Sequence, residues 1–174
     1  MCALFGNSRD VAFMRGINRE LINDIIQAEV DIYKLIIDQT PTNLYGESDS
    51  KTYYTPFRIA SIIKPDDQTS AYTQFGPDYN QIVTFGFLRD DLKEYEVVIE
   101  TGDYILWNEL AFEVDHIIEN NYLFSRNQET NKTIGDQFGW NVSIVCSAHV
   151  TRKNRSQLEG NVVVVDVLKR RNNV

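Results

Sequence analysis

The sequence predicts a mainly β protein: a small antiparallel β-barrel or sandwich with long loops, an N-terminal amphipathic α-helix and a C-terminal extension. Three observations favour this class. Apolar and polar side chains alternate along several short segments, which is the period of a strand buried on one face. Turn-forming pairs, such as Gly102-Asp103 and Asn108-Glu109, separate those segments. Short strands joined by tight turns are typical of meanders that curl into small barrels or sandwiches.

Length and composition allow a single domain with a substantial core. The chain has 174 residues, of which 43% are hydrophobic and 11% aromatic, so wholesale disorder is excluded. A net charge of -8 disfavours tight nonspecific binding to nucleic acid, which requires a positive face. No apolar run approaches the roughly 20 residues that span a bilayer, so we expect no membrane partner. Cys2 and Cys146 are too few for a disulfide framework, and we expect reduced thiols.

Three segments differ in character. Residues 1–29 form an N-terminal arm, residues 30–151 the β-barrel domain, and residues 152–174 a basic link followed by a C-terminal β arm. In the arm, apolar residues recur every four positions, which predicts an amphipathic helix from about Val11 to Ala28. The helix packs on its own barrel or docks on a neighbouring subunit. The first is favoured, because most amphipathic helices bury their apolar stripe within their own fold.

The strands of the barrel are predicted by alternation, by β-branched content and, for Tyr104 to Trp107, by an apolar run that follows a turn. They are expected at Val30 to Ile37, at Thr52 to Ile63 with an edge or bulge at Pro56, around Val83, Phe85 and Phe87, at Tyr104 to Trp107, around Phe112 and Val114, at Tyr122 to Phe124 after a turn at Asn120-Asn121, and at Trp140 to Thr151. The charged residues from Arg89 to Glu96 predict a loop or a short polar link.

Two long polar loops, Asp38 to Ser50 and Pro65 to Asn80, carry aromatic residues. These are Tyr45 in the first loop, and Tyr72, Phe75 and Tyr79 in the second. Exposed aromatic side chains on polar loops are good anchors for a protein interface, so we predict that they contact a partner chain. The alternative, equally favoured, is that they fold back onto the barrel rim.

The C-terminal segment combines a polar, basic link, Thr151 to Gly160, with a valine-rich run. A free strand of this composition is an aggregation hazard. We therefore predict that Val162, Val163, Val164 and Val165 are paired, either with their own sheet or with an adjacent subunit by strand addition.

The sequence offers few candidate residues for catalysis or for binding a metal or cofactor. Glu113 and Asp115 share a strand face, and paired carboxylates can bind metal or catalyse acid–base reactions, but His116 points to the opposite face. A solvated polar face is the favoured interpretation. No serine trio, phosphate-binding glycine loop or zinc-spaced Cys/His cluster is found in the sequence. We therefore predict no catalytic residue, no metal site and no cofactor, and a protein that is not an enzyme.

The order of several short motifs resembles that of neck, or head-closure, proteins of contractile-tailed bacteriophages. The motifs are Asn43-Leu44-Tyr45-Gly46-Glu47-Ser48, Tyr53-Tyr54-Thr55-Pro56, Phe75-Gly76-Pro77-Asp78, Val83-Thr84-Phe85, Gly102-Asp103-Tyr104-Ile105 with Trp107, and Phe112-Glu113-Val114. The resemblance covers roughly Ile32 to Thr151. Each motif is weakly specific alone, and their order carries the resemblance.

The resemblance implies a structural protein of the virion neck, assembled in the host cytoplasm as a homo-oligomeric ring, six- or twelve-fold. Its partners would be portal or adaptor proteins on the head side and tail-completion or tail-terminator proteins on the tail side. Genomic DNA would pass through the lumen without sequence-specific binding, and an acidic lumen would let it slide. A tail-completion, tail-terminator or minor capsid protein, and a soluble small-barrel binding module, are the alternatives.

Overall fold

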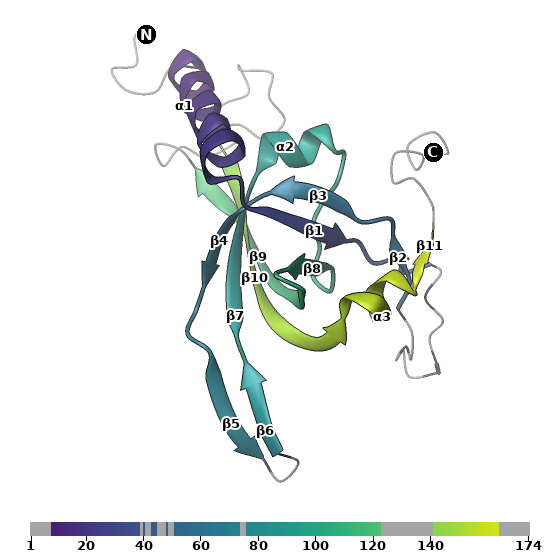
Figure 1. Cartoon of the computed structure of the whole chain (residues 1–174). Coiled ribbons are helices and arrows are strands. Elements are labelled where there is room, and N and C mark those ends of the chain that lie inside the picture. The colour runs from purple at the N-terminus through teal and green to yellow at the C-terminus, as the bar shows by residue number, and fades with distance from the viewer. Residues whose placement is uncertain are drawn as a thin grey trace.

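The computed structural model describes residues 8–38, 40, 43–44, 48, 51–73, 76–122 and 141–163. These residues form one seven-stranded antiparallel sheet, two small two-stranded sheets and a few helices (Figure 1). The elements are α1 (Ser8–Glu20), the π-helical η1 (Leu21–Ile26), β1 (Glu29–Tyr33), β2 (Tyr53–Tyr54), β3 (Phe57–Ala60), β4 (Ile62–Pro65), β5 (Thr69–Thr73), β6 (Gly76–Asn80), β7 (Ile82–Leu88), α2 (Arg89–Glu94), β8 (Tyr104–Trp107), β9 (Leu110–Tyr122), β10 (Asn141–Asn154), α3 (Arg155–Glu159) and β11 (Val162–Val163).

The seven-stranded sheet curls until its two edges meet. Its order is β3-β1-β8-β9-β10-β7-β4, so the two outermost strands are consecutive in the chain and separated by Ser61 alone. Ser61 is fully buried; its N–H donates to the Ala28 carbonyl (2.8 Å) and its hydroxyl to the Gly86 carbonyl (3.2 Å). The predicted mainly β, barrel-like class with an N-terminal helix is confirmed. The two edges meet at one residue, and no ladder joins β3 to β4.

The main core lies inside this curled sheet. Val83, Phe85 and Phe87 on β7 are at most 1% exposed, which confirms the predicted alternation. The register places Phe85 opposite Cys146 of β10, and the Phe85 ring lies 5.7 Å from that of Phe112 in an edge-to-face contact. Burying each of these large apolar side chains stabilises the fold by about 1.5–3 kcal/mol.

A second core lies under the C-terminal elements. Tyr33, Tyr53 and Tyr104 pack there with Leu158 of α3, which is fully buried. The predicted polar link at Thr151 to Gly160 is therefore wrong: β10 continues to Asn154, and α3 follows. The prediction missed this because one apolar residue, Leu158, carries the packing.

Three other sequence expectations are corrected. The charged segment expected as a loop forms α2, because Leu92 packs into the main core and Asp90 and Asp91 occupy the first helical turn. The second long loop is largely the β5–β6 hairpin. The turn expected at Asn120-Asn121 is instead part of β9. There the register with β10 shifts between the pairs Ser143–Asn121 and Val145–Ile118.

The segment expected as one strand from Thr52 to Ile63 is divided. Residues 53–54 form β2, and β3 and β4 follow on either side of the Ser61 bend. Pro56 falls in the gap between β2 and β3, as expected for a residue that cannot donate to a ladder. The strand expected at Val30 to Ile37 ends at Tyr33, although Leu35 still forms an isolated bridge with Tyr53.

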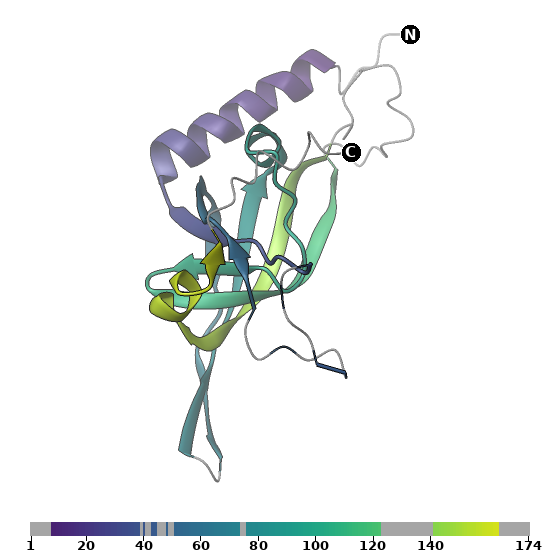
Figure 2. The same ribbon diagram turned by 90° about the vertical axis from the view of Figure 1, so that its right-hand side faces the viewer.

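The predicted N-terminal helix is confirmed and consists of α1 followed by η1. It begins at Ser8, three residues earlier than expected. It ends where Gln27 adopts a left-handed conformation with φ of 52°. Figures 1 and 2 show α1 across one end of the curled sheet, while the β5–β6 hairpin projects from the opposite end. The two elements are therefore presented on opposite sides of the barrel.

Candidate assembly interface

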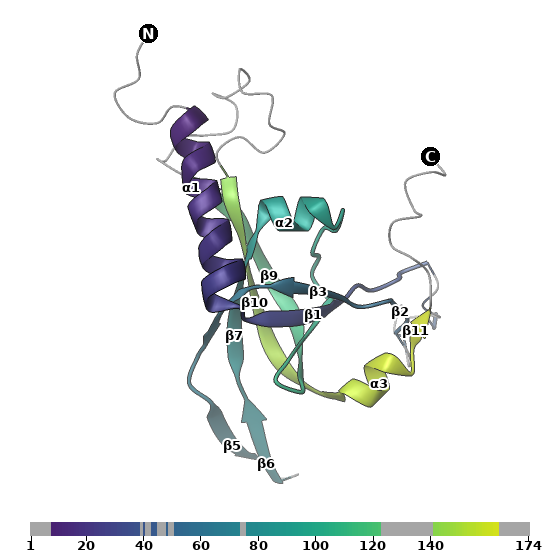
Figure 3. The ribbon, with the colours of Figure 1, turned by 45° about the horizontal axis from the view of Figure 1, so that its top comes forward.

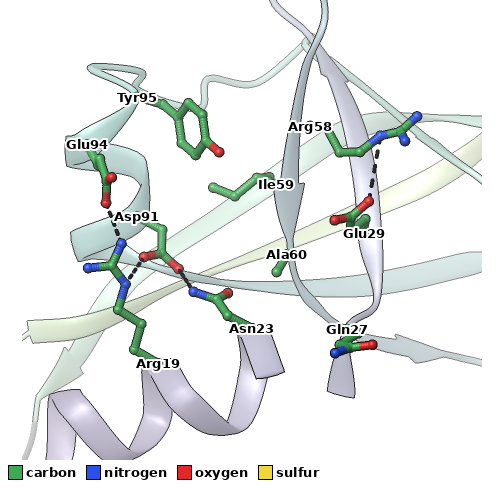
Figure 4. Close-up of a pocket in the computed structure, with 10 residues that line it drawn as sticks. All are labelled: Arg19, Asn23, Gln27, Glu29, Arg58, Ile59, Ala60, Asp91, Glu94 and Tyr95. Carbon is green, nitrogen blue, oxygen red and sulfur yellow. Dashed lines mark hydrogen bonds and ion pairs between the residues drawn. The ribbon is translucent and has the colours of Figure 1, made fainter. Parts of the chain in front are cut away.

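Helix α1 contacts the barrel mainly through its polar face. Arg15, Arg19 and Asn23 recur every four residues and all contact α2, beside which α1 lies (Figure 3). Arg19 Nε lies 2.9 Å from Asp91 Oδ1, and Asn23 Nδ2 donates to Asp91 Oδ2 at 3.4 Å (Figure 4). The pKa of Arg19 is raised, first by its hydrogen bond to Glu94 and then by the charge of Asp91. The helix is thus held by ion pairs.

The opposite face of the helix is apolar and exposed. We call Phe13, Ile17, Leu21 and Ile25 the α1 stripe; these residues are 65%, 43%, 40% and 71% exposed. Only the neighbouring Ile22 is buried, against Leu88 and Val142, among the apolar residues described between 13 and 26. The favoured expectation that the stripe packs on its own barrel is therefore wrong. Contiguous exposed apolar surface on a helix indicates an interaction site.

Gly16 lies beside the α1 stripe in the middle of the helix. A Cβ added there would meet no other atom of the described residues within 4 Å. A glycine inside a helix costs about 1 kcal/mol relative to alanine, and no neighbour in the described part of the chain requires its small size. Because glycine has no side chain, another chain can approach the helix backbone closely at this position.

A pocket of about 540 Å³ lies between η1, β3 and α2 (Figure 4). Its charged side chains neutralise one another: Arg19 pairs with Asp91 and Glu94, and Arg58 pairs with Glu29. A charged small ligand would have to break these pairs to bind. The pocket therefore belongs to the contacts that hold α1 and the sheet edge.

The predicted aromatic interface residues lie partly on the projecting hairpin. Tyr72 is on β5 and Tyr79 on β6; the register pairs Tyr72 with Pro77 and Ser70 with Tyr79, which places the two tyrosines two rungs apart on the ladder. Tyr45 and Phe75 lie outside the described residues. The hairpin carries the described positions away from the barrel, as an interface arm requires (Figure 2).

The valine-rich segment is paired within the chain. Val162 and Val163 form β11, which runs parallel to β2 with Val162 opposite Tyr53. Val162 also packs against the second core. The prediction allowed pairing within the chain or with an adjacent subunit, and the structure shows pairing within the chain. The partner strand is β2, which lies outside the large sheet. Val164 and Val165 lie outside the described residues.

The carboxylates considered for catalysis are engaged in pairs. Glu113 accepts hydrogen bonds from Tyr104 (2.5 Å) and Lys51 (2.9 Å), and Asp115 contacts His149 (2.8 Å). Burial alone would raise the pKa of Glu113, but the hydrogen bonds from Tyr104 and Lys51 outweigh it and lower the pKa. Among the described residues, no three His, Cys, Asp or Glu side chains gather as metal ligands.

Cys146 is fully buried on the inner face of β10, where it alternates with the outward residues Val145 and Ser147. Burial raises the pKa of its thiol to about 12, so the thiolate is scarce at neutral pH. This cysteine is therefore a core residue and a poor nucleophile.

The contact between the polar face of the helix and α2 was not predicted, although the sequence contains a signal for it. Arg15, Arg19 and Asn23 have the same four-residue spacing as the stripe, and α2 offers a matching set of carboxylates, Asp91 and Glu94. Basic residues at helical spacing, with an acidic cluster elsewhere in the chain, predict such a contact only if the fold brings the two together.

Comparison of the chain with known protein families finds no match, and comparison with curated protein sequences finds no similar protein. In the described part of the chain, no helix combines the length and apolar character needed to cross a bilayer. The fold and its surfaces define a small curled β-sheet protein with an exposed apolar helix stripe and a projecting hairpin.

Proposed function

We propose that this chain is a structural protein of the neck of a tailed bacteriophage. In this role it forms a ring that closes the DNA-filled head and joins it to the tail. The observation that carries the proposal is the α1 stripe, an apolar surface that the protein's own fold leaves exposed. The motif order from Asn43 to Val114, which resembles that of head-closure proteins, indicates which kind of assembly it serves.

The arrangement of surfaces suits a subunit with several neighbours. In a ring, each copy contacts two others, and in a neck it also contacts layers above and below. Helix α1 and the β5–β6 hairpin occupy opposite ends of the barrel, so they can serve different contacts at the same time (Figure 1). Stable interfaces bury about 800 Å² per partner, so we expect the stripe to act together with other surfaces.

The charge of the chain is compatible with a DNA conduit. With a net charge of -8, a ring of six or twelve copies would carry a strongly negative potential. A negative lumen repels the phosphate backbone and lets DNA move through without sticking. The ring would lie between portal or adaptor proteins and tail-completion or tail-terminator proteins.

Inactivation of the gene in a phage that encodes this chain tests the proposal. We expect DNA-filled heads without tails, or heads that lose their DNA, together with separately assembled tails. Supplying the wild-type protein in trans should restore tailed particles, and cryo-electron microscopy of these should place the chain as a ring below the portal. Normal tailed particles without the protein, or its location in the capsid shell or the tail tube, would overturn the proposal.

A further inference from the structure

A second apolar feature crosses the outer face of the large sheet. Ile62 of β4 is in register with Gly86 of β7, Gly86 with Val145 of β10, and Val145 with Ile118 of β9. We call these four residues the outer row. Ile62 is 46% exposed and Ile118 44%, and the two residues between them are half-buried. On these strands the outer row alternates with residues of the main core or residues packed against it, namely Ile63, Phe85, Phe87, Ile144, Cys146 and Ile117. The outer row therefore faces away from the core.

Gly86 shapes the middle of this row. A Cβ there would meet the Cβ of Ile62 at 3.6 Å, which is ordinary van der Waals contact, so the fold would accept alanine. Glycine leaves the backbone between Ile62 and Val145 accessible. A bulky apolar side chain from another molecule can therefore sit between the two.

The outer row and the α1 stripe are similar in length. From Phe13 to Ile25 the helix rises about 18 Å, at about 1.5 Å per residue. Four adjacent strands, spaced about 4.8 Å apart, carry the outer row over about 14 Å. The stripe faces away from the barrel that carries it, so it meets an outer row only on another copy.

Unpaired polar side chains border both surfaces, with carboxylates beside the stripe and a lysine beside the outer row. Glu20 and Asp24 border the C-terminal half of the stripe, and neither pairs with another described residue. On the sheet, Lys64 and His116 lie in the row next to the outer row, linked through Thr84 and Ser147 by register. Both are exposed, and within the described part of the chain both lack a carboxylate partner.

We propose that the α1 stripe of one copy docks across the outer row of the next copy, with Glu20 and Asp24 beside Lys64 of that copy. The proposal rests on the proposed function and specifies the contact by which the ring forms. The two surfaces differ, so the contact is head-to-tail, and such contacts close into rings when the rotation between copies allows it.

Charge reversal tests the pairing in purified protein. Glu20→Lys with Asp24→Lys, and separately Lys64→Glu, should each weaken self-association by about tenfold or more, measured by sedimentation velocity over a concentration series. The chain with all three substitutions should recover association. Glu109→Lys is the matched control, because Glu109 is an exposed carboxylate outside both surfaces, and it should leave association unchanged. Failure of the triple variant to recover would overturn the proposal.

Cysteine cross-linking tests the geometry independently. In a Cys2→Ser background, Ile17→Cys and Ile118→Cys proteins should form a disulfide with each other when mixed and oxidised, and neither should do so alone. A disulfide between two Ile17→Cys chains would show helix-to-helix pairing and overturn the proposal. Wild-type protein that assembles without the mixed cross-link would overturn this contact but leave the neck function standing. Wild-type protein that stays monomeric at every concentration would count against both.

Discussion

Arg19 and Asp91 form the ion pair that orients the N-terminal helix, with Nε and Oδ1 2.9 Å apart. The Asp91 side chain is only 6% exposed, whereas that of Arg19 is 49% exposed. A buried carboxylate is costly unless it is paired, so α2 attracts the basic face of α1. The consequence is that the apolar face of the same helix is turned outward.

Replacing Arg19 by alanine should loosen α1 from the barrel, because the buried Asp91 carboxylate loses the cation that pairs with it. The hydrogen bond from Asn23 to Asp91 would remain. We expect a loss of about 1–3 kcal/mol, the cost of leaving a buried polar group without its partner. Hydrogen exchange of residues 12–26 should accelerate accordingly. Arg9→Ala, on the same helix and without an ion pair to described residues, is the control. Unchanged protection in Arg19→Ala would show that the Arg19–Asp91 pair is not what holds the helix on the barrel.

Replacing Leu158 by alanine should destabilise the whole fold, because this side chain is fully buried in the second core. We expect a cost of about 2–5 kcal/mol, measured by urea unfolding. Leu44→Ala makes the same chemical change at a residue that is 97% exposed, and it should stay within about 0.5 kcal/mol of wild type. A cost below about 1 kcal/mol at Leu158 would mean that α3 contributes little to the core.

The Glu113 cluster should make stability depend on pH. The pKa of Glu113 is below its ordinary value of 4.5 in the folded protein, since Tyr104 and Lys51 donate to the carboxylate. Its contribution is therefore fully present above pH 4.5 and is lost as pH falls through the folded pKa. The stability difference between wild type and Glu113→Gln should shrink in that acidic window, measured by thermal unfolding. A difference that stays constant with pH would contradict the assignment.

Replacing Tyr72 and Phe75 together by serine should leave the monomer's circular dichroism and melting nearly unchanged, because Tyr72 lies on the projecting hairpin. Interface aromatic residues often contribute about 2 kcal/mol or more to binding. Particles made with this variant should show filled heads that lack tails, or heads that leak DNA. Normal numbers of infectious, tailed particles would contradict an interface role, and a misfolded monomer would assign the aromatic residues to the barrel.

Much of the fold could be read from the sequence. Strands β7 and β10 were predicted because aromatic and β-branched residues alternate there with other residues, and only one phase buries them. Strand β8 was predicted as an apolar run that follows the turn at Gly102-Asp103. Helix α2 was missed because six mostly charged residues carry no apolar period, and its position depends on Leu92 reaching the core. The β5–β6 hairpin was missed because its sequence is largely polar and contains Gly76 and Pro77, which are typical of loops.

The candidate interface was only partly predictable. The four-residue spacing of Phe13, Ile17, Leu21 and Ile25 establishes that this helix has an apolar stripe, since side chains at that spacing share one face. Which face turns inward was decided by residues about 70 positions later. The carboxylates of α2 are placed beside the helix by the folding of the sheet, and they bind its arginines. Local periodicity is a property of neighbouring residues, whereas the pairing of buried charge depends on contacts that exist only once the chain has folded.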